Sequence, residues 1–179
     1  MSSIPLFCTA NVPGDVLSSI LHEAHDWSEY LSGDKNPAIA IIKTVSMLAE
    51  PPPPCRPPIT DFESQFLDKQ PEELAKLLAT HVPDPGLNKL SVYEFLIADT
   101  RTVEDKSVLF VHKTRSESGD NLDYVRLAAS QAQIMPVAAA VGTLDAVELQ
   151  RAVDEDGILR GSPPRQKGGK APRKQLQAK

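Results

Sequence analysis

The sequence has little cysteine, no long apolar run and no start that resembles a secretory signal. Each of these features argues against a class of protein. Its two cysteines, Cys8 and Cys55, are too few and too far apart for a disulfide scaffold or a zinc ribbon. No stretch of about 20 apolar residues is present, so no helix is expected to cross a bilayer. The first residues lack the basic stretch and apolar core of a signal peptide. We therefore expect an intracellular protein, cytoplasmic or nuclear or both, with reduced thiols and no membrane partner.

The familiar motifs of catalysis and metal binding are also missing. There is no Gly-rich phosphate loop, no Gly-x-Ser-x-Gly nucleophile elbow and no local cysteine–histidine signature. His22 and His25 lack both the four-residue spacing of zinc proteases and a third ligand. Residues 154–156 are acidic, but the residues after them do not continue a calcium-binding loop. The sequence therefore predicts no metal and no cofactor.

Four polar residues beside expected turns or strand ends are nevertheless candidates for lining a cleft. Hydration by water in ordinary loops is the simpler explanation for all of them, so the sequence leaves open whether the domain is an enzyme. The four are His81, Asp84, Asp99 and His112.

What the sequence does contain is enough apolar surface for one domain and an uneven distribution of charge. It has 179 residues, of which 41% are apolar. Six of its 19 basic residues lie from Arg165 onward, where there is no acidic residue. The remaining 13 basic and 24 acidic residues give everything before Arg165 a formal charge of −11. We therefore expect an acidic domain over residues 1–161 and a disordered basic interaction tail over residues 162–179.

The first third of the chain predicts a strand, a helix and a stiff loop. Residues 4–8 alternate as in a strand, and Pro13 with Asp15 suits the start of a helix that residues 32–34 end. The apolar stripe of this helix is Val16, Leu17, Ile20, Leu21, Ala24, Trp27 and Leu31. Residues 38–49 are apolar enough to be buried, but their pattern does not distinguish a strand from a helix. The proline-rich segment at about 50–58 is interpreted as an inserted, extended surface loop rather than a ligand for an aromatic groove.

The rest of the domain predicts more strands and two helices. Residues 61–67 are expected to form a short strand, and Pro71 to start a helix with Leu74, Leu77 and Leu78 buried. Strands are expected near residues 93–98, 108–111 and 124–127, paired antiparallel. Residues 143–145 should cap a helix over about 146–153, followed by a turn ending at Gly157 and a short edge strand at 158–159. Together these elements predict an α+β domain with a small mixed or antiparallel sheet covered by helices.

The domain resembles an uncharacterised family found in fungi and some actinobacteria. The residues that carry the resemblance are 12–13, 23–27, 79–87, 95–99 and 153–161, and it extends from Ile4 to Gly161 apart from the proline-rich insertion. The resemblance implies a small intracellular α+β domain. It implies no catalytic residues, because the family has no assigned activity.

The tail resembles a different protein, the amino-terminal tail of histone three. Residues 168–176, Gly-Gly-Lys-Ala-Pro-Arg-Lys-Gln-Leu, look identical to a segment of that tail. The resemblance implies that Lys170, Lys174 and Lys179 are acetylation sites and that Arg173 is a methylation site. Residues 165–167 and 177–178 depart from the histone. Generic basic low complexity is the alternative explanation.

The chemistry of the tail suits modification by an enzyme. Gly169 lets the backbone approach closely, and Pro172 prevents a helix. Acetylation of Lys170 would remove its charge and create the neutral amide that acetyl-lysine readers bind. Histone acetyltransferases and such readers are therefore the expected partners.

Three functions are compatible with these observations. The first is a non-enzymatic interaction protein that presents the histone-like segment to chromatin-modifying enzymes or readers. The second is a ligand-binding or enzymatic domain whose tail only localises it. The third is weak nucleic-acid binding, in which six cations neutralise about six phosphates.

Overall fold

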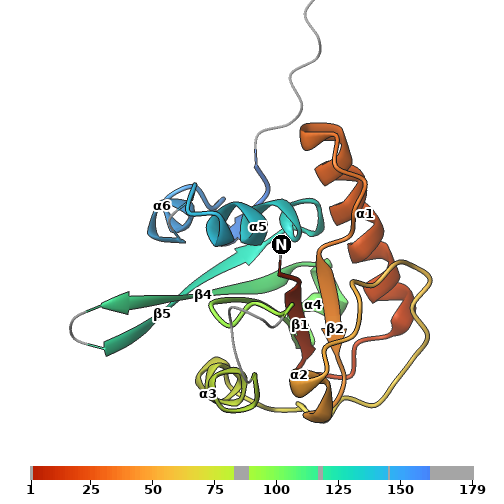
Figure 1. Cartoon of the computed structure of the whole chain (residues 1–179). Helices are drawn as coiled ribbons and strands as arrows, with labels where there is room; N and C mark the ends of the chain where they lie inside the picture. The colour runs from red at the N-terminus through yellow and green to blue at the C-terminus, as the bar shows by residue number, and fades with distance from the viewer. Residues whose placement is uncertain (1, 83–88, 117–118, 145, 162–179) are drawn as a thin grey trace, which may run out of the picture.

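Six strands form one mixed sheet in the order β2-β1-β3-β4-β5-β6 (Figure 1). The structure is a computed structural model that describes residues 2–82, 89–116, 119–144 and 146–161. The six strands are β1 (Ile4–Cys8), β2 (Ile39–Ile42), β3 (Glu94–Ala98), β4 (Val108–Ser116), β5 (Gly119–Leu127) and β6 (Ile158–Leu159). The mixed sheet with several helices confirms the predicted α+β class.

The sheet has parallel pairs at both edges and an antiparallel centre. Strand β1 is parallel to both β2 and β3, whereas β3, β4 and β5 are antiparallel neighbours. The edge strand β6 is parallel to β5. All five residues of β1 are buried, as expected for a strand covered on both faces. The antiparallel pairing predicted for the later strands is confirmed, and β4 and β5 are longer than predicted, with nine residues each.

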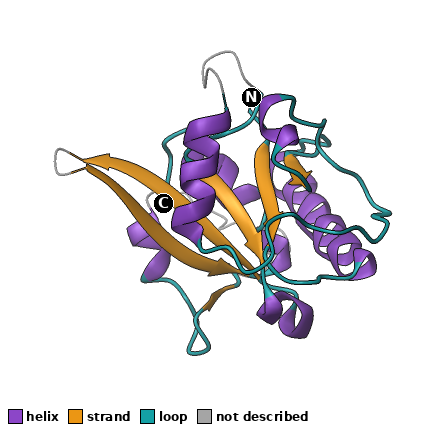
Figure 2. Ribbon diagram, turned by 90° about the horizontal axis from the view of Figure 1, so that it is seen from below, coloured by secondary structure: helices purple, strands orange, loops and turns teal. Residues whose placement is uncertain are grey.

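Helices cover both faces of the sheet, so there are two cores (Figure 2). The helices are α1 (Gly14–Ser32), α2 (Ser46–Ala49), α3 (Pro71–His81), α4 (Thr100–Asp105), α5 (Ile134–Ala140) and α6 (Ala146–Gln150), with a 3₁₀ turn η1 (Ala129–Gln131). Leu6 of β1 packs in one core with residues of α1, η1, α5 and α6. Phe7 packs in the other with residues of α2 and α3. This split follows from the alternation of side chains along a strand.

Helix α1 begins and ends where the sequence predicts. Pro13 precedes its first residue, and Gly33 ends it with a φ of 74° and an N–H that donates to the Glu29 carbonyl at 2.8 Å. Leu31, predicted to be buried, is instead 51% exposed. The last buried residue of α1 is Ser28, because the final turn extends beyond the neighbouring elements (Figure 1).

The apolar segment that fitted either a strand or a helix contains both. Residues 39–42 form β2 at the edge of the sheet, and α2 follows at residues 46–49. The proline-rich segment then runs without helix or strand, as predicted, along the outer side of β2. There the Cys55 N–H donates to the Ile39 carbonyl at 2.7 Å. The prolines therefore cover an otherwise open sheet edge.

The prediction of a strand over residues 61–67 is wrong. Residues 61–64 are irregular and residues 65–68 form a turn. The Gln65 N–H donates to the Lys43 carbonyl at 3.0 Å, and the Asp68 N–H donates to the Thr9 carbonyl at 2.9 Å. These single bonds to two different segments replace a ladder and aim Phe66 into the core, where its ring meets Phe7 edge-on at 4.9 Å.

The predicted elements at the end of the domain are shorter than expected. Helix α6 has five residues, and the predicted cap Asp145 lies outside the described residues. Gly157 ends the following turn with a φ of 77°, and β6 is the predicted edge strand. The sequence analysis did not predict α4, η1 or α5.

Candidate functional site

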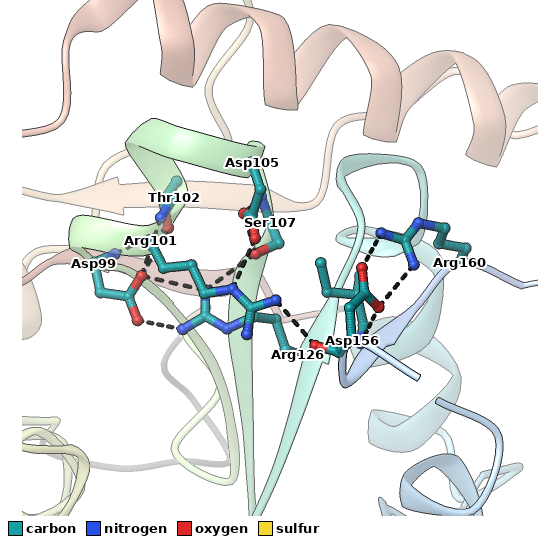
Figure 3. A network of polar contacts seen from close by, with 9 residues as sticks. Asp99, Arg101, Thr102, Asp105, Ser107, Arg126, Asp156 and Arg160 are labelled. Carbon is teal, nitrogen blue, oxygen red and sulfur yellow. Dashed lines mark hydrogen bonds and ion pairs between the residues drawn. The ribbon is translucent and has the colours of Figure 1, made fainter. Parts of the chain in front are cut away.

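A polar network joins the end of β3 to β5 and to the turn before β6 (Figure 3). It is built on Asp99, the residue directly after β3. The Asp99 carboxylate caps α4 by accepting from the Thr102 N–H at 3.1 Å, and the Thr102 hydroxyl accepts from the Asp99 N–H at 3.0 Å. This reciprocal arrangement is a capping box, which satisfies donors that the helix start leaves free.

Arg126 of β5 reaches across β4 to hold Asp99. Its two terminal nitrogens donate to the two carboxylate oxygens of Asp99, and one also donates to the Ser107 hydroxyl at 3.1 Å. Only 11% of the Arg126 side chain is exposed. A fork of this kind fits the planar guanidinium to the planar carboxylate.

The electrostatics keep Asp99 ionised. Partial burial raises the pKa of its carboxyl, but the hydrogen bonds and charge of Arg126, together with Thr102, outweigh burial and lower the pKa below its usual value. The hydrogen bonds of the carboxylate are thus made with Arg126 and with the first turn of α4. Asp99 therefore connects β3, β5 and α4, and we call this arrangement the Asp99 clamp.

The network continues on the surface to the turn at residues 154–157. Arg101 of α4 donates to Asp105 at 2.7 Å and to the Asp156 carbonyl at 3.0 Å. Arg160 donates to Asp154 at 2.8 Å and to both carboxylate oxygens of Asp156. The hydrogen bonds from Arg160 lower the pKa of Asp156 to about 2. The acidic turn is therefore held by arginines.

Two grooves flank the outer side of α1 and share three lining residues, Ser19, His22 and Asp26. The first, of about 680 Å³, lies between α1 and the proline-rich segment. The second, of about 930 Å³, lies between α1 and the point where the chain leaves β6. We call the second the Trp27 groove and define it by Glu23, Asp26, Trp27, Tyr30, Arg160 and Gly161.

The two helical histidines lie at these grooves without forming a metal site. His22 is exposed, and its Nδ1 lies 3.6 Å from Asp26 Oδ1. His25 is turned toward the loop after α1, where its Nε2 lies 2.7 Å from the Lys35 carbonyl oxygen. Within the described ranges, no three His, Cys, Asp or Glu side chains gather closely enough to hold a metal ion.

The structure does not bring the four predicted cleft residues together. His112 of β4 pairs with Glu94, the first residue of β3, at 3.5 Å between Nδ1 and Oε1, whereas Asp99 follows the last residue of β3. His81 ends α3. Asp84 lies outside the described residues. Asp99 and His112 thus lie beside opposite ends of β3.

The cysteines are separate free thiols. Cys8 is buried in β1, and burial raises the pKa of its thiol to about 12 although Lys43 acts in the opposite direction. Cys55 lies in the proline-rich segment, and its Sγ accepts from the Ile41 N–H at 3.4 Å. Cys8 is therefore protonated and unreactive at neutral pH.

Comparison with known proteins identifies the family. Residues 60–162 match the family described as a domain of unknown function, DUF6924. The chain belongs to this family. Neither the curated proteins nor the solved structures include a match to the chain.

The DUF6924 match begins later than the sequence resemblance, which started at Ile4. It runs from just after the proline-rich segment to just after β6, and includes Asp99, Arg126 and the acidic turn. Strands β1 and β2 and helix α1 precede it, and α1 contributes most of the Trp27 groove. The network therefore belongs to the family-matched part, and the groove joins that part to the N-terminal segment.

The tail residues proposed as modification or binding sites all lie outside the described residues: Gly169, Lys170, Pro172, Arg173, Lys174 and Lys179. No helix among the described residues is both long and apolar enough to cross a bilayer. The sequence analysis missed Arg126 and the pairing of Trp27 with Tyr30. A signal existed for both: Asp99 and Thr102 have capping-box spacing, and Trp27 and Tyr30 are three residues apart on one helix.

Proposed function

We propose that the chain is an interaction protein whose domain carries a histone-like segment for recognition by lysine acetyltransferases or acetyl-lysine readers. The single observation behind this proposal is the sequence of residues 168–176, nine residues that look identical to part of the histone three tail. A match of this length in a varied sequence is more specific than any motif of the domain.

The place where the chain leaves the domain supports the proposal. Strand β6 is an edge strand, and Gly161, two residues after its end, is exposed. The described chain therefore ends at the surface of the domain. An acidic domain of formal charge −11 also repels nucleic acid, which favours a protein partner for the basic tail over a phosphate backbone.

The chemistry proposed for Lys170 is ordinary acetyl transfer. The neutral Nζ attacks the thioester carbonyl of acetyl-coenzyme A, the carbon–sulfur bond breaks, coenzyme A leaves as the thiol, and the amide nitrogen loses a proton. Gly169 before the lysine lets the backbone approach closely, and Pro172 after it disfavours a helix, which suits a groove that positions the amine at the thioester.

The test is intact-protein mass spectrometry after incubation with acetyl-coenzyme A and an acetyltransferase that recognises Gly-Lys-x-Pro. We expect one acetyl group on Lys170 first, with Lys174 and Lys179 slower. Pro172→Ala should slow modification of Lys170 about tenfold or more, equivalent to about 1.4 kcal/mol of transition-state binding. Lys167→Gln, which removes a charge outside the matched segment, should have little effect.

The opposite ranking would support the nucleic-acid alternative. In that case every lost positive charge weakens binding about equally, and Pro172→Ala changes nothing. An unmodified Lys170 beside a fully acetylated histone peptide in the same reaction would overturn the proposal.

A further inference from the structure

We propose that the Trp27 groove binds the first part of the chain's own tail, residues 162–167, through the cations of Arg165 and Lys167. Only that short stretch is then held against the domain. The histone-like residues after it are left for other partners. This inference stands independently of acetylation.

The groove offers an aromatic surface on the outside of α1. The rings of Trp27 and Tyr30 are stacked, with centroids 5.7 Å apart and planes 29° apart. Tyr30 is 58% exposed, which is unusual for a large aromatic side chain. Trp27 is half-buried. The stacked pair therefore presents a partly exposed aromatic surface to an occupant of the groove.

The charges at the groove favour a cation. Glu23 and Asp26 both line it, and neither has a lysine or arginine partner in the described part of the chain. Asp154 also lines it but is already paired with Arg160. An arginine or lysine placed there would therefore gain both a carboxylate and an aromatic face, and cation–π contacts on exposed rings contribute about 0.5–1 kcal/mol.

The tail begins at the groove itself. Gly161 lines the groove, and its backbone has a φ of 71°. A Cβ atom at this position would lie 2.9 Å from the side chain of Gln131, so glycine leaves room for that side chain. Arg165 follows only four residues later, so its Cα lies within about 14 Å of the Gly161 Cα. Pro163 and Pro164 between them favour an extended path. Lys174 and Lys179 lie beyond two consecutive glycines and are not constrained in this way.

The resemblance to the histone three tail divides the chain's tail into two parts. Residues 165–167, which the groove can reach first, are those that depart from the histone sequence, whereas residues 168–176 match it. Docking of the first part is thus compatible with presentation of the second.

The experiment uses the fluorescence of Trp27, the only tryptophan of the chain. We compare the emission of the full chain with that of a chain ending at Gly161, at about 0.01 M and about 1 M salt, where the Debye length falls from about 30 Å to about 3 Å. The two emission spectra should differ at low salt and converge at high salt. The difference should not depend on protein concentration, because the contact is intramolecular.

Two double variants with the same loss of charge identify the docking residues. Arg165→Gln with Lys167→Gln should give the spectrum of the truncated chain, whereas Lys174→Gln with Lys179→Gln should give that of the full chain. A peptide of residues 162–179 added to the truncated chain should restore the full-chain emission. Asp26→Asn, which removes one exposed carboxylate charge, should weaken that binding by up to about fivefold, and the exposed Glu63→Gln, which lies outside the groove, should not.

Several outcomes would overturn the docking. Identical spectra for the full and truncated chains at low salt would show that the tail does not reach Trp27. Equal effects of the two double variants would show a diffuse charge effect instead of a docked segment. A difference that grows with protein concentration would assign the groove to a second copy of the chain.

Discussion

A single carboxylate, Asp99, connects three elements of this fold. It ends β3, caps α4 and accepts both arms of the Arg126 guanidinium from β5. Removing one partner of such a pair leaves the other without its hydrogen bonds in a partly buried place. The residue is therefore a point at which one substitution disturbs a strand end, a helix start and a neighbouring strand together.

We predict that Asp99→Asn lowers the free energy of unfolding by about 1.5–3 kcal/mol at neutral pH, the range for a hydrogen bond to a charged group. The pKa of Asp99 is lowered in the folded protein, so its ionised form stabilises the fold above the unfolded pKa of about 3.9. That contribution is lost as pH falls through the folded pKa. Urea unfolding at pH 7 and near pH 3 should show the gap between wild type and variant narrowing in acid.

Asp156→Asn is the matched control for this prediction. Asp156 also pairs with an arginine, Arg160, but both side chains are about half exposed, so its loss should have little effect on stability. If the two variants were equally destabilised, the role assigned to the Asp99 clamp would be wrong.

For the Asp99–Arg126 pair, the sequence analysis identified one of the two residues. Asp99 was a candidate because it follows a strand, but its partner Arg126 is 27 residues away. Only the antiparallel register of β3, β4 and β5 brings the two together. Long-range pairs of this kind depend on strand register, which a single sequence does not specify.

Among the elements, those with a strong local signal were predicted best. Pro13 and Gly33 bound α1, and Pro71 with its two glutamates begins α3. The segment at 38–49 remained ambiguous because β2 is buried by the sheet and by the loop beside it, which removes the polar alternation of a half-exposed strand. Helices α4 and α5 were missed because they have only six and seven residues, too short for a clear periodicity.

Phe66 shows why residues 61–67 were mistaken for a strand. The segment has the alternation of a strand, but the Gln65 N–H bonds to Lys43 and the following Asp68 N–H bonds to Thr9, so no single neighbouring strand pairs with it. Phe66 is fully buried, whereas Leu67 is 40% exposed. The alternation reflects one side chain anchoring a turn against Phe7. Pattern alone does not distinguish an anchored turn from a short strand.

We predict that Phe66→Ala lowers the free energy of unfolding by about 3–5 kcal/mol, the usual cost of truncating a buried phenylalanine. Leu67→Ala, the adjacent exposed residue, should change it by no more than about 0.5 kcal/mol. Urea unfolding followed by circular dichroism measures both. Comparable losses for the two substitutions would contradict the anchoring role assigned to Phe66.

The whole molecule is assembled from two stretches of sequence. The family match covers residues 60–162, but the sheet order places β1, from outside that match, directly beside β3. Ile4, Leu6 and Phe7 of β1 are each at most 1% exposed, and they belong to the cores on both faces of the sheet. The N-terminal segment therefore completes both cores of the domain.

We predict that the family-matched part, residues 60–162, does not fold alone, whereas residues 1–161 do. Without β1, strand β3 loses its parallel neighbour and becomes an exposed edge, and Phe95 and Phe66 lose Phe7 from their shared contact. Circular dichroism and urea unfolding should show a cooperative transition only for residues 1–161. Adding a separate peptide of residues 1–59 should restore cooperative unfolding to the shorter chain, because the missing strand and α1 pair with it without a covalent link. A cooperative transition for residues 60–162 alone would mean that β3 can close the sheet without β1, and that the N-terminal segment only adds to a domain that is already complete.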